Sequence, residues 1–245
     1  MPFTFAHPAI ILPLKHLPKR WYSLTGLIAG SMTPDFEYFI RMQVKSYYSH
    51  TLPGLFWFDV PLGLLLSYVY LLLIRGEFID HLPRFLYNRF AKYRQLPLNI
   101  SLLSVAVMAC SVFIGSASHL FWDGFTHPHG YFVQYFPALA TTISLGTHRV
   151  FIYKILQHSS TLIGFAAIAA VIMPMPKKRV VRTHPIAKYW AIVVLTMALI
   201  TVARLSTGLK LHQIGNLLVT AIAGGLIGLI VASRNLIKNN KVNGR

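Results

Sequence analysis

Long apolar runs dominate the chain, and short polar or Gly- and Pro-containing stretches separate them. A membrane-spanning helix needs about 20 mainly apolar residues. Five runs reach or approach that length, at about 56–74, 98–122, 155–173, 188–205 and 213–233. The pattern predicts an all-α fold, a polytopic transmembrane helical bundle of five to six spans, built as a single integral membrane domain over residues 1–245.

The path of the N-terminal region, residues 1–55, is left open by the pattern. Segment 21–40 either crosses the membrane as a sixth helix or dips into it and returns, and its acidic residues disfavour a lipid-facing span. Pro34 directly follows Thr33. This pair predicts that a new helix starts here, with Thr33 as its N-cap.

The composition supports the membrane interpretation. Of the 245 residues, 55% are hydrophobic and only 12% are charged, against about 25% charged in ordinary soluble domains. Lys and Arg number 23 against 6 Asp and Glu, a balance that nucleic-acid-binding proteins share. With such apolar runs we instead expect basic loops facing anionic headgroups, membrane lipids as partners and no nucleic acid. The pairs Gly26/Gly30 and Gly224/Gly228 match a helix-packing spacing but do not specify an oligomeric partner.

The basic loop residues predict an orientation. With five spans, segment 75–97, segment 174–188 and the C-terminal tail share one side and hold 14 of the 23 Lys and Arg. By the positive-inside rule this side is cytoplasmic, so loop 123–154 faces outward. The basic residues of region 1–55 do not fit this arrangement, which is a second reason why its path stays open.

The sharpest chemical signal ends the second run. His119 and Asp123 are spaced four residues apart, so they share one face of a helix, and His127 continues that face if the helix runs on. Imidazole and carboxylate at this spacing form half of a site for zinc or a similar divalent metal. The alternative is a His–Asp hydrogen bond at the end of a span. Cys110 is the single cysteine, which excludes an intrachain disulfide and a cysteine-based zinc site.

A second set of polar residues precedes the first run. Asp35 and His50 lie there, and two membrane crossings return the chain from this side to the end of the second run. Asp35 and His50 are therefore expected to meet His119 and Asp123. Two histidines and two carboxylates complete a zinc coordination set. Two further histidines are candidate ligands in reserve, His7 and His127.

Each of these residues also has a structural interpretation. Asp35 would lie in the first turn of the predicted helix, where a carboxylate is favoured anyway, and His7 fits equally well as a buried hydrogen-bond donor. Basic residues offer partners for the carboxylates without any metal, namely Arg41, Lys45 and Arg149. These alternatives remain open at the level of sequence.

Five motifs resemble a family of bacterial membrane proteins, the domain of unknown function 4184. They are PFTFAHP at 2–8, GSMTPD at 30–35, HTLPG at 50–54, HLFWDGFTH at 119–127 and LQHSS at 156–160. The resemblance covers nearly the whole chain. It implies a multi-pass protein of the bacterial inner membrane, and the family brings no activity with it.

A more distant likeness carries a mechanism. The order of His, Pro-Asp, His and His-x-x-x-Asp is similar to YdjM-type membrane-bound metal-dependent hydrolases and to zinc-dependent phospholipase C. That likeness implies that Asp35, His50, His119 and Asp123 hold zinc and that His7 binds a neighbouring metal. The His-Arg-Gly-x-Thr-His motif of the first group is absent, and no acidic residue follows Asp123 to supply the phospholipase's later His-x-x-x-Glu helix. One or two metals are therefore expected, not three.

The sequence favours a metal-dependent hydrolase with its site on the periplasmic or outer side. A metal-bound water would attack a phosphoester of a lipid-like substrate, with Asp35 or Glu37 as catalytic base where it is not a metal ligand. The alternative is a non-enzymatic membrane protein whose polar or metal-binding cluster holds helices together. A transporter ranks third, because the polar residues gather at one face and do not line a path through the midplane.

Overall fold

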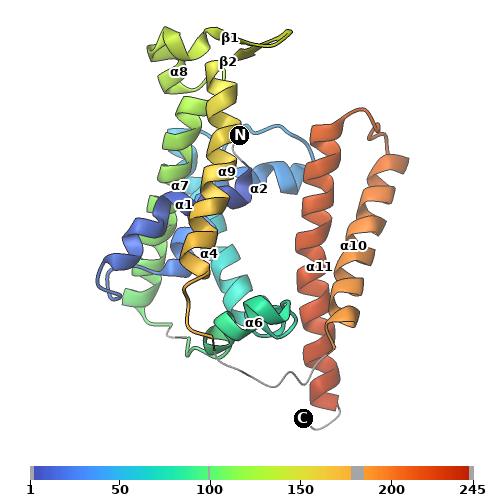
Figure 1. Cartoon of the computed structure of the whole chain (residues 1–245). Coiled ribbons are helices and arrows are strands. Elements are labelled where there is room, and N and C mark those ends of the chain that lie inside the picture. Colours follow the sequence, from blue (N-terminus) through green and yellow to red (C-terminus); the bar gives the residue numbers. More distant parts are fainter. Residues whose placement is uncertain (1–2, 99, 178–184, 243–245) are drawn as a thin grey trace. The chain divides into compact units, whose positions relative to one another are not determined.

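The computed structural model describes residues 3–98, 100–177 and 185–242 (Figure 1). Five of its helical stretches are long and apolar enough to cross a membrane: Leu52–Asp80, Leu102–Tyr135, Ile152–Ile172, Ile186–Ser206 and Ile214–Asn235. Each overlaps one of the five predicted runs. The helical, multi-pass architecture predicted from the apolar pattern is confirmed.

Contacts divide the chain into two compact units, and the first comprises Met1–Asp35, Tyr47–Leu65 and Ile100–Pro174. Two long helices dominate this unit, and short helical segments of the N-terminal region pack against them. Its helices are η1 (Thr4–Ala6), α1 (Pro8–Ile11), η2 (Leu12–His16), most of α2 (Leu24–Arg41), α3 (Leu52–Gly54), the π-helical η3 (Leu55–Asp59), the start of α4 (Val60–Val69), α7 (Leu102–Thr126), α8 (Tyr131–Tyr135), η6 (Pro137–Ala140) and α9 (Ile152–Ile172).

The second unit comprises Phe36–Ser46, Leu66–Asn99 and Met175–Arg245. Besides the ends of α2 and α4 it contains the π-helical η4 (Tyr70–Ile74), α5 (Arg75–Asp80), α6 (Arg84–Phe90), η5 (Ala91–Tyr93), α10 (Ile186–Ser206) and α11 (Ile214–Val242). Helices α10 and α11 lie side by side along their length (Figure 1). A Cβ on Gly224 would lie 2.9 Å from Met197 Cα, and one on Gly228 2.8 Å from the Val193 carbonyl oxygen. This small-residue pair therefore packs two helices of the same chain together.

Helix α2 corrects the predicted helix start at Thr33. The helix runs unbroken from Leu24 to Arg41 with Pro34 inside it, and the Thr33 hydroxyl donates to the Ala29 carbonyl, 2.7 Å away, so it does not cap a new helix. A proline has no N–H to donate to the carbonyl four residues earlier. That carbonyl, on Gly30, instead accepts a 3.0 Å bond from the Ser116 hydroxyl of α7. Tertiary contact thus compensates for the missing helix bond.

Close packing of α2 against α7 makes that bond possible. A Cβ on Gly30 would lie 2.2 Å from the Val112 carbonyl oxygen, and one on Gly115 2.5 Å from the Leu27 carbonyl oxygen. Glycine on each helix therefore lets the two backbones meet. Helix α2 is not among the candidate spans of the described residues. Its close packing against α7 is what positions it in the first unit.

A short β-hairpin in loop 123–154 was not predicted. Strands β1 (Thr142–Leu145) and β2 (His148–Phe151) pair antiparallel. Gly146 begins the two-residue turn with φ of 61°, a value that a two-residue hairpin turn with glycine at its first position requires. The rest of the predicted all-α architecture is unchanged by this hairpin.

Candidate metal centre

Helix α7 contributes two buried side chains, His119 and Asp123, one turn apart on the same face. The His119 Nδ1 lies 2.7 Å from the backbone carbonyl oxygen of Ser31 in α2. A carbonyl only accepts, so Nδ1 carries the proton and Nε2 carries the lone pair. This contact fixes the imidazole in the tautomer of a metal ligand, in the way that outer partners of metal-binding histidines usually do.

Helix α2 contributes Asp35, whose side chain is fully buried. The Thr4 hydroxyl of η1 donates a short hydrogen bond to Asp35 Oδ2. Asp35 Oδ1 has no hydrogen-bond partner among the described residues. One carboxylate oxygen is thus held in place while the other faces the histidines.

The turn before α3 contributes His50. Thr51 caps α3 by accepting a 3.0 Å bond from the Gly54 N–H, and Gly54 passes so close to the Tyr48 carbonyl that a Cβ would lie 1.9 Å from its oxygen. The motif HTLPG therefore encodes a tight turn. It leaves the His50 Nδ1 3.0 Å from the Ser49 hydroxyl and directs its Nε2 towards the two carboxylates.

Four side-chain atoms converge from these three elements. Asp35 Oδ1 lies 3.6 Å from His50 Nε2 and 3.5 Å from His119 Nε2. Asp123 Oδ2 lies 3.7 and 3.4 Å from the same two nitrogens. Good N–H···O hydrogen bonds measure about 2.7–3.2 Å, so these are not direct hydrogen bonds. A tetrahedron with zinc–ligand bonds of about 2.0–2.1 Å has edges of about 3.3–3.4 Å, which is close to the observed spacing.

His7, between η1 and α1, extends the cluster on the other side of Asp123. Its Nε2 lies 3.6 Å from Asp123 Oδ1, and its ring stacks on His119 with centroids 3.7 Å apart. Neither ring nitrogen of His7 has a hydrogen-bond partner among the described residues. Burial, and next the neighbouring His119, lowers the pKa of His7 to about 3. At neutral pH this imidazole is therefore uncharged and able to bind a cation.

The charges of the cluster are balanced by histidines alone. Among the described residues, every basic group within 4.0 Å of the Asp35 or Asp123 carboxylate is an imidazole. Burial alone would raise the pKa of Asp35, but the imidazoles of His119 and His50 hold it below its ordinary value. Burial alone would lower the pKa of His50, and the Asp123 and Asp35 carboxylates raise it. The site thus favours positive charge between its carboxylates, as protons or as a metal ion.

Two predicted residues lie differently. His127, at the end of α7, has Nδ1 3.1 Å from the Asp123 backbone carbonyl and 3.6 Å from Asp123 Oδ2. Its Nδ1 therefore donates to that carbonyl, and Nε2 is the nitrogen left for chemistry. The Glu37 carboxylate accepts 2.8 Å bonds from Arg41 of the same helix. Glu37 is not in either of the His/Asp groups with metal-binding spacing that the described residues contain, and its role as a base stays a prediction.

Sequence reasoning did not single out the residues that orient the ligands. Thr4, Ser31 and Ser116 hold Asp35, His119 and the α2 backbone by hydrogen bonds. Thr4 and Ser31 fall inside the motifs PFTFAHP and GSMTPD, so motif membership was the available signal. Ser116 falls in an apolar run and gave none.

Comparison with known proteins agrees with the motifs. The family model described as domain of unknown function (DUF4184) matches residues 1–234. No curated protein and no solved structure matches the chain. A match over nearly the entire length shows that this chain belongs to the domain of unknown function 4184 family.

Proposed function

We propose that the protein is a membrane-embedded, metal-dependent hydrolase of the bacterial inner membrane that acts on a phosphoester of a lipid-like substrate. One observation carries the proposal. Two buried carboxylates and two imidazoles face one another at 3.4–3.7 Å, too far apart for hydrogen bonds and close to the edge lengths of a zinc tetrahedron. We assign Asp35, His50, His119 and Asp123 as zinc ligands.

The same cluster offers a second cation fewer ligands. Asp123 Oδ1 and His7 Nε2 lie 3.6 Å apart, while Asp123 Oδ2 faces the first site. His119 cannot serve both sites, because its Nδ1 donates to Ser31. A metal held by His7 and Asp123 alone would keep open positions, which is the arrangement of catalytic and not of structural sites.

A zinc ion held by His7 and Asp123, with open positions, would supply a water of near-neutral pKa as the nucleophile. The chain's own contribution is to fix the ligands and to receive a proton. His127 suits the second role, since its Nε2 is its basic nitrogen and its side chain is 29% exposed. The water oxygen would bond to phosphorus, the bond from phosphorus to the leaving alcohol oxygen would break, and the proton accepted by His127 would pass to that alcohol.

Depth in the membrane favours a lipid-like substrate. His50 lies directly before one candidate span and His127 lies within the C-terminal part of another, and these two side chains are the more exposed members of the cluster, at 19% and 29%. The predicted orientation, with the basic loops in the cytoplasm, would open the site to the periplasmic side.

The test combines metal content with turnover in the full chain purified in detergent. We expect bound zinc by elemental analysis and zinc-dependent release of p-nitrophenol from bis(p-nitrophenyl) phosphate, with both lost in His119→Ala. Zinc binding without hydrolysis of this or a phospholipid diester would favour the alternative of a structural metal cluster. Zinc content that is unchanged in both His119→Ala and Asp123→Ala would overturn the metal assignment itself.

A further inference from the structure

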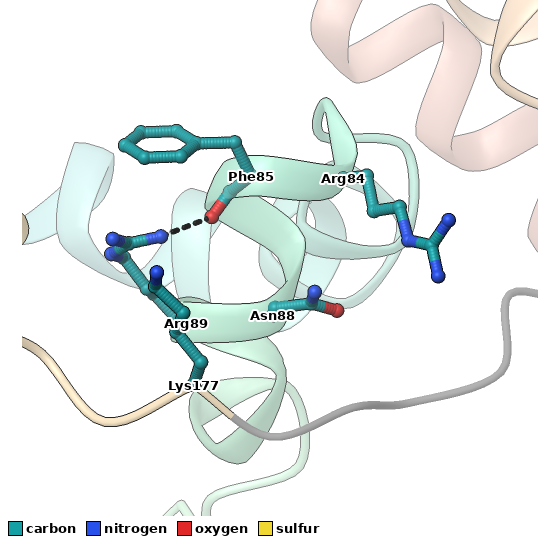
Figure 2. A pocket seen from close by; sticks show the side chains of 5 residues that line it. All are labelled: Arg84, Phe85, Asn88, Arg89 and Lys177. Atoms are coloured by element: carbon teal, nitrogen blue, oxygen red, sulfur yellow. Dashed lines mark hydrogen bonds between the residues drawn. The ribbon is translucent and has the colours of Figure 1, made fainter.

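A basic pocket lies in the second unit, distinct from the candidate metal centre. It has a volume of about 270 Å³ and is lined by Arg84, Phe85, Asn88, Arg89 and Lys177 (Figure 2). Three of these five side chains are cationic and none is acidic. We propose that this pocket binds the phosphate of an anionic lipid headgroup.

Helix α6 builds most of the pocket through two pairs of residues spaced four apart. Arg84 and Asn88 share one face, and Phe85 and Arg89 share the next. Arg89 is buried; it donates a 2.9 Å bond to the Phe85 carbonyl and its guanidinium lies 4.1 Å from the Phe85 ring centre (Figure 2). One cation is therefore fixed as a wall of the pocket.

The other two cations lack acidic partners within the unit. The six acidic residues of the chain are all described, and three of them belong to this unit. Each of the three has another basic partner: Glu37 pairs with Arg41, Glu77 with His81 and Asp80 with Arg94. Arg84 and Lys177 are exposed and pair with no carboxylate among the described residues. Both cations are therefore available to an anion from outside the described part of the chain.

The position of the pocket along the chain favours a lipid headgroup as the anion that pairs with these cations. Arg84 follows the end of one candidate span, at Asp80, by four residues, and Lys177 follows the end of another, at Ile172, by five. The headgroup layer begins at the face of the hydrocarbon core and is about 5–8 Å deep, and a stretch of four or five residues, about 13–18 Å when extended, is long enough to place both side chains in it. Phe85, at 48% exposure, adds exposed apolar surface beside these cations. Cations beside an exposed aromatic ring suit a headgroup phosphate with acyl chains below it.

The experiment measures lipid binding to the full chain in neutral detergent by native mass spectrometry. Phosphatidylglycerol is the anionic probe, phosphatidylcholine the zwitterionic one and inorganic phosphate the lipid-free one. The test variant is Arg84→Gln with Lys177→Gln. The matched control, Arg234→Gln with Lys188→Gln, removes the same two kinds of charge from exposed positions of the same unit.

We expect phosphatidylglycerol affinity to fall about 25-fold in the pocket variant, at about fivefold for each basic residue near anionic lipid, and less than about twofold in the control. Phosphatidylcholine should bind weakly to all three proteins. Equal losses in the pocket and control variants would mean diffuse attraction and overturn the proposal, as would no loss in either. Inorganic phosphate that binds alone and displaces phosphatidylglycerol would overturn the lipid source. Zinc content should stay unchanged in both variants, since neither touches the metal cluster.

Discussion

Four buried carboxylates, two in each unit, are neutralised in different ways. In the second unit, Asp80 accepts a 2.7 Å bond from Arg94, and Glu37 accepts 2.8 Å bonds from Arg41. In the first unit, Asp35 and Asp123 lie 3.4–3.7 Å from imidazole nitrogens. An ion pair at hydrogen-bond distance is complete in itself. Carboxylate oxygens and imidazole nitrogens that lie just beyond hydrogen-bond distance have the spacing of ligands around a metal ion.

Arginine and histidine differ in how they offset the cost of a buried carboxylate. Burying an unpaired charge costs several kcal/mol, so neither unit can leave its carboxylates alone. Arginine solves the problem once and permanently, because its guanidinium always carries a charge. Histidine solves it conditionally, since a neutral imidazole can give its lone pair to a metal. Under the proposed function, the imidazoles beside Asp35 and Asp123 suit a site that binds a cation, whereas the arginines beside Asp80 and Glu37 do not.

The largest effect is expected at Asp123, whose two oxygens face both parts of the cluster. Asp123→Asn keeps the shape and removes the charge, so zinc affinity should fall by more than the 10–100-fold typical of outer-shell changes, and bound zinc should fall below about a tenth of the wild-type amount. Elemental analysis of the purified protein measures this. Asp80→Asn in the second unit is the matched control and should keep its zinc. Equal zinc in the two variants would erase the distinction between the units.

Removal of zinc should lower the thermal stability of variants that keep the metal ligands of the first unit, and should leave a ligand variant unchanged. A ligand that binds only the folded state at about 1,000 times its dissociation constant adds about 4 kcal/mol to the free energy of unfolding. Wild-type protein and the Arg94→Gln variant should therefore lose thermal stability when zinc is chelated. Asp123→Asn should melt at the same temperature with and without chelator. A chelator effect that persists in Asp123→Asn would place the stabilising metal elsewhere.

A smaller effect is expected at Thr4, which holds Asp35 Oδ2. Thr4→Val keeps the side-chain volume and removes the hydrogen bond, so zinc affinity should fall about 10–100-fold while saturating zinc restores full occupancy. Competition with a fluorescent zinc indicator measures the affinity. Thr33→Val is the control, because the Thr33 hydroxyl is also buried in this unit but, among the described residues, bonds only the Ala29 carbonyl. Similar losses in both would show a general packing defect.

Much of the fold followed from periodicity, and its exceptions have local causes. Apolar length alone predicted five spans, because backbone groups in a bilayer must be satisfied within a helix. The helix start predicted at Thr33 was wrong, because a hydroxyl on another helix, Ser116, satisfies the carbonyl that Pro34 leaves open. The residues near Pro34 in the sequence do not show that a side chain from another helix will bond this carbonyl. The hairpin around Gly146 was missed because a four-residue strand in a polar loop gives a weak signal.

The candidate site was predictable as a gathering of residues but not as a geometry. Topology placed His50 and His119 on the same side, and their ring centroids lie 5.5 Å apart. The sequence could not show that Asp123 turns one oxygen to His7 and the other to His50 and His119. The pair of Glu37 and Arg41, in contrast, has the i,i+4 spacing of neighbours on a helix, so it could have been predicted from the sequence.

The smallest effect is expected in the second unit, at Arg94→Gln. The Arg94 side chain is 38% exposed, so water and salt screen its pairing with Asp80, and water can reach the carboxylate when the guanidinium is gone. Exposed pairs contribute up to about 1 kcal/mol, and we expect a loss of that size with zinc content unchanged. Reversible unfolding in mixed micelles measures it. A loss above about 3 kcal/mol is the size reported for breaking a buried pair, and it would mean that Asp80 also lies in a site that cannot tolerate an uncompensated carboxylate, which would remove the contrast with Asp35 and Asp123.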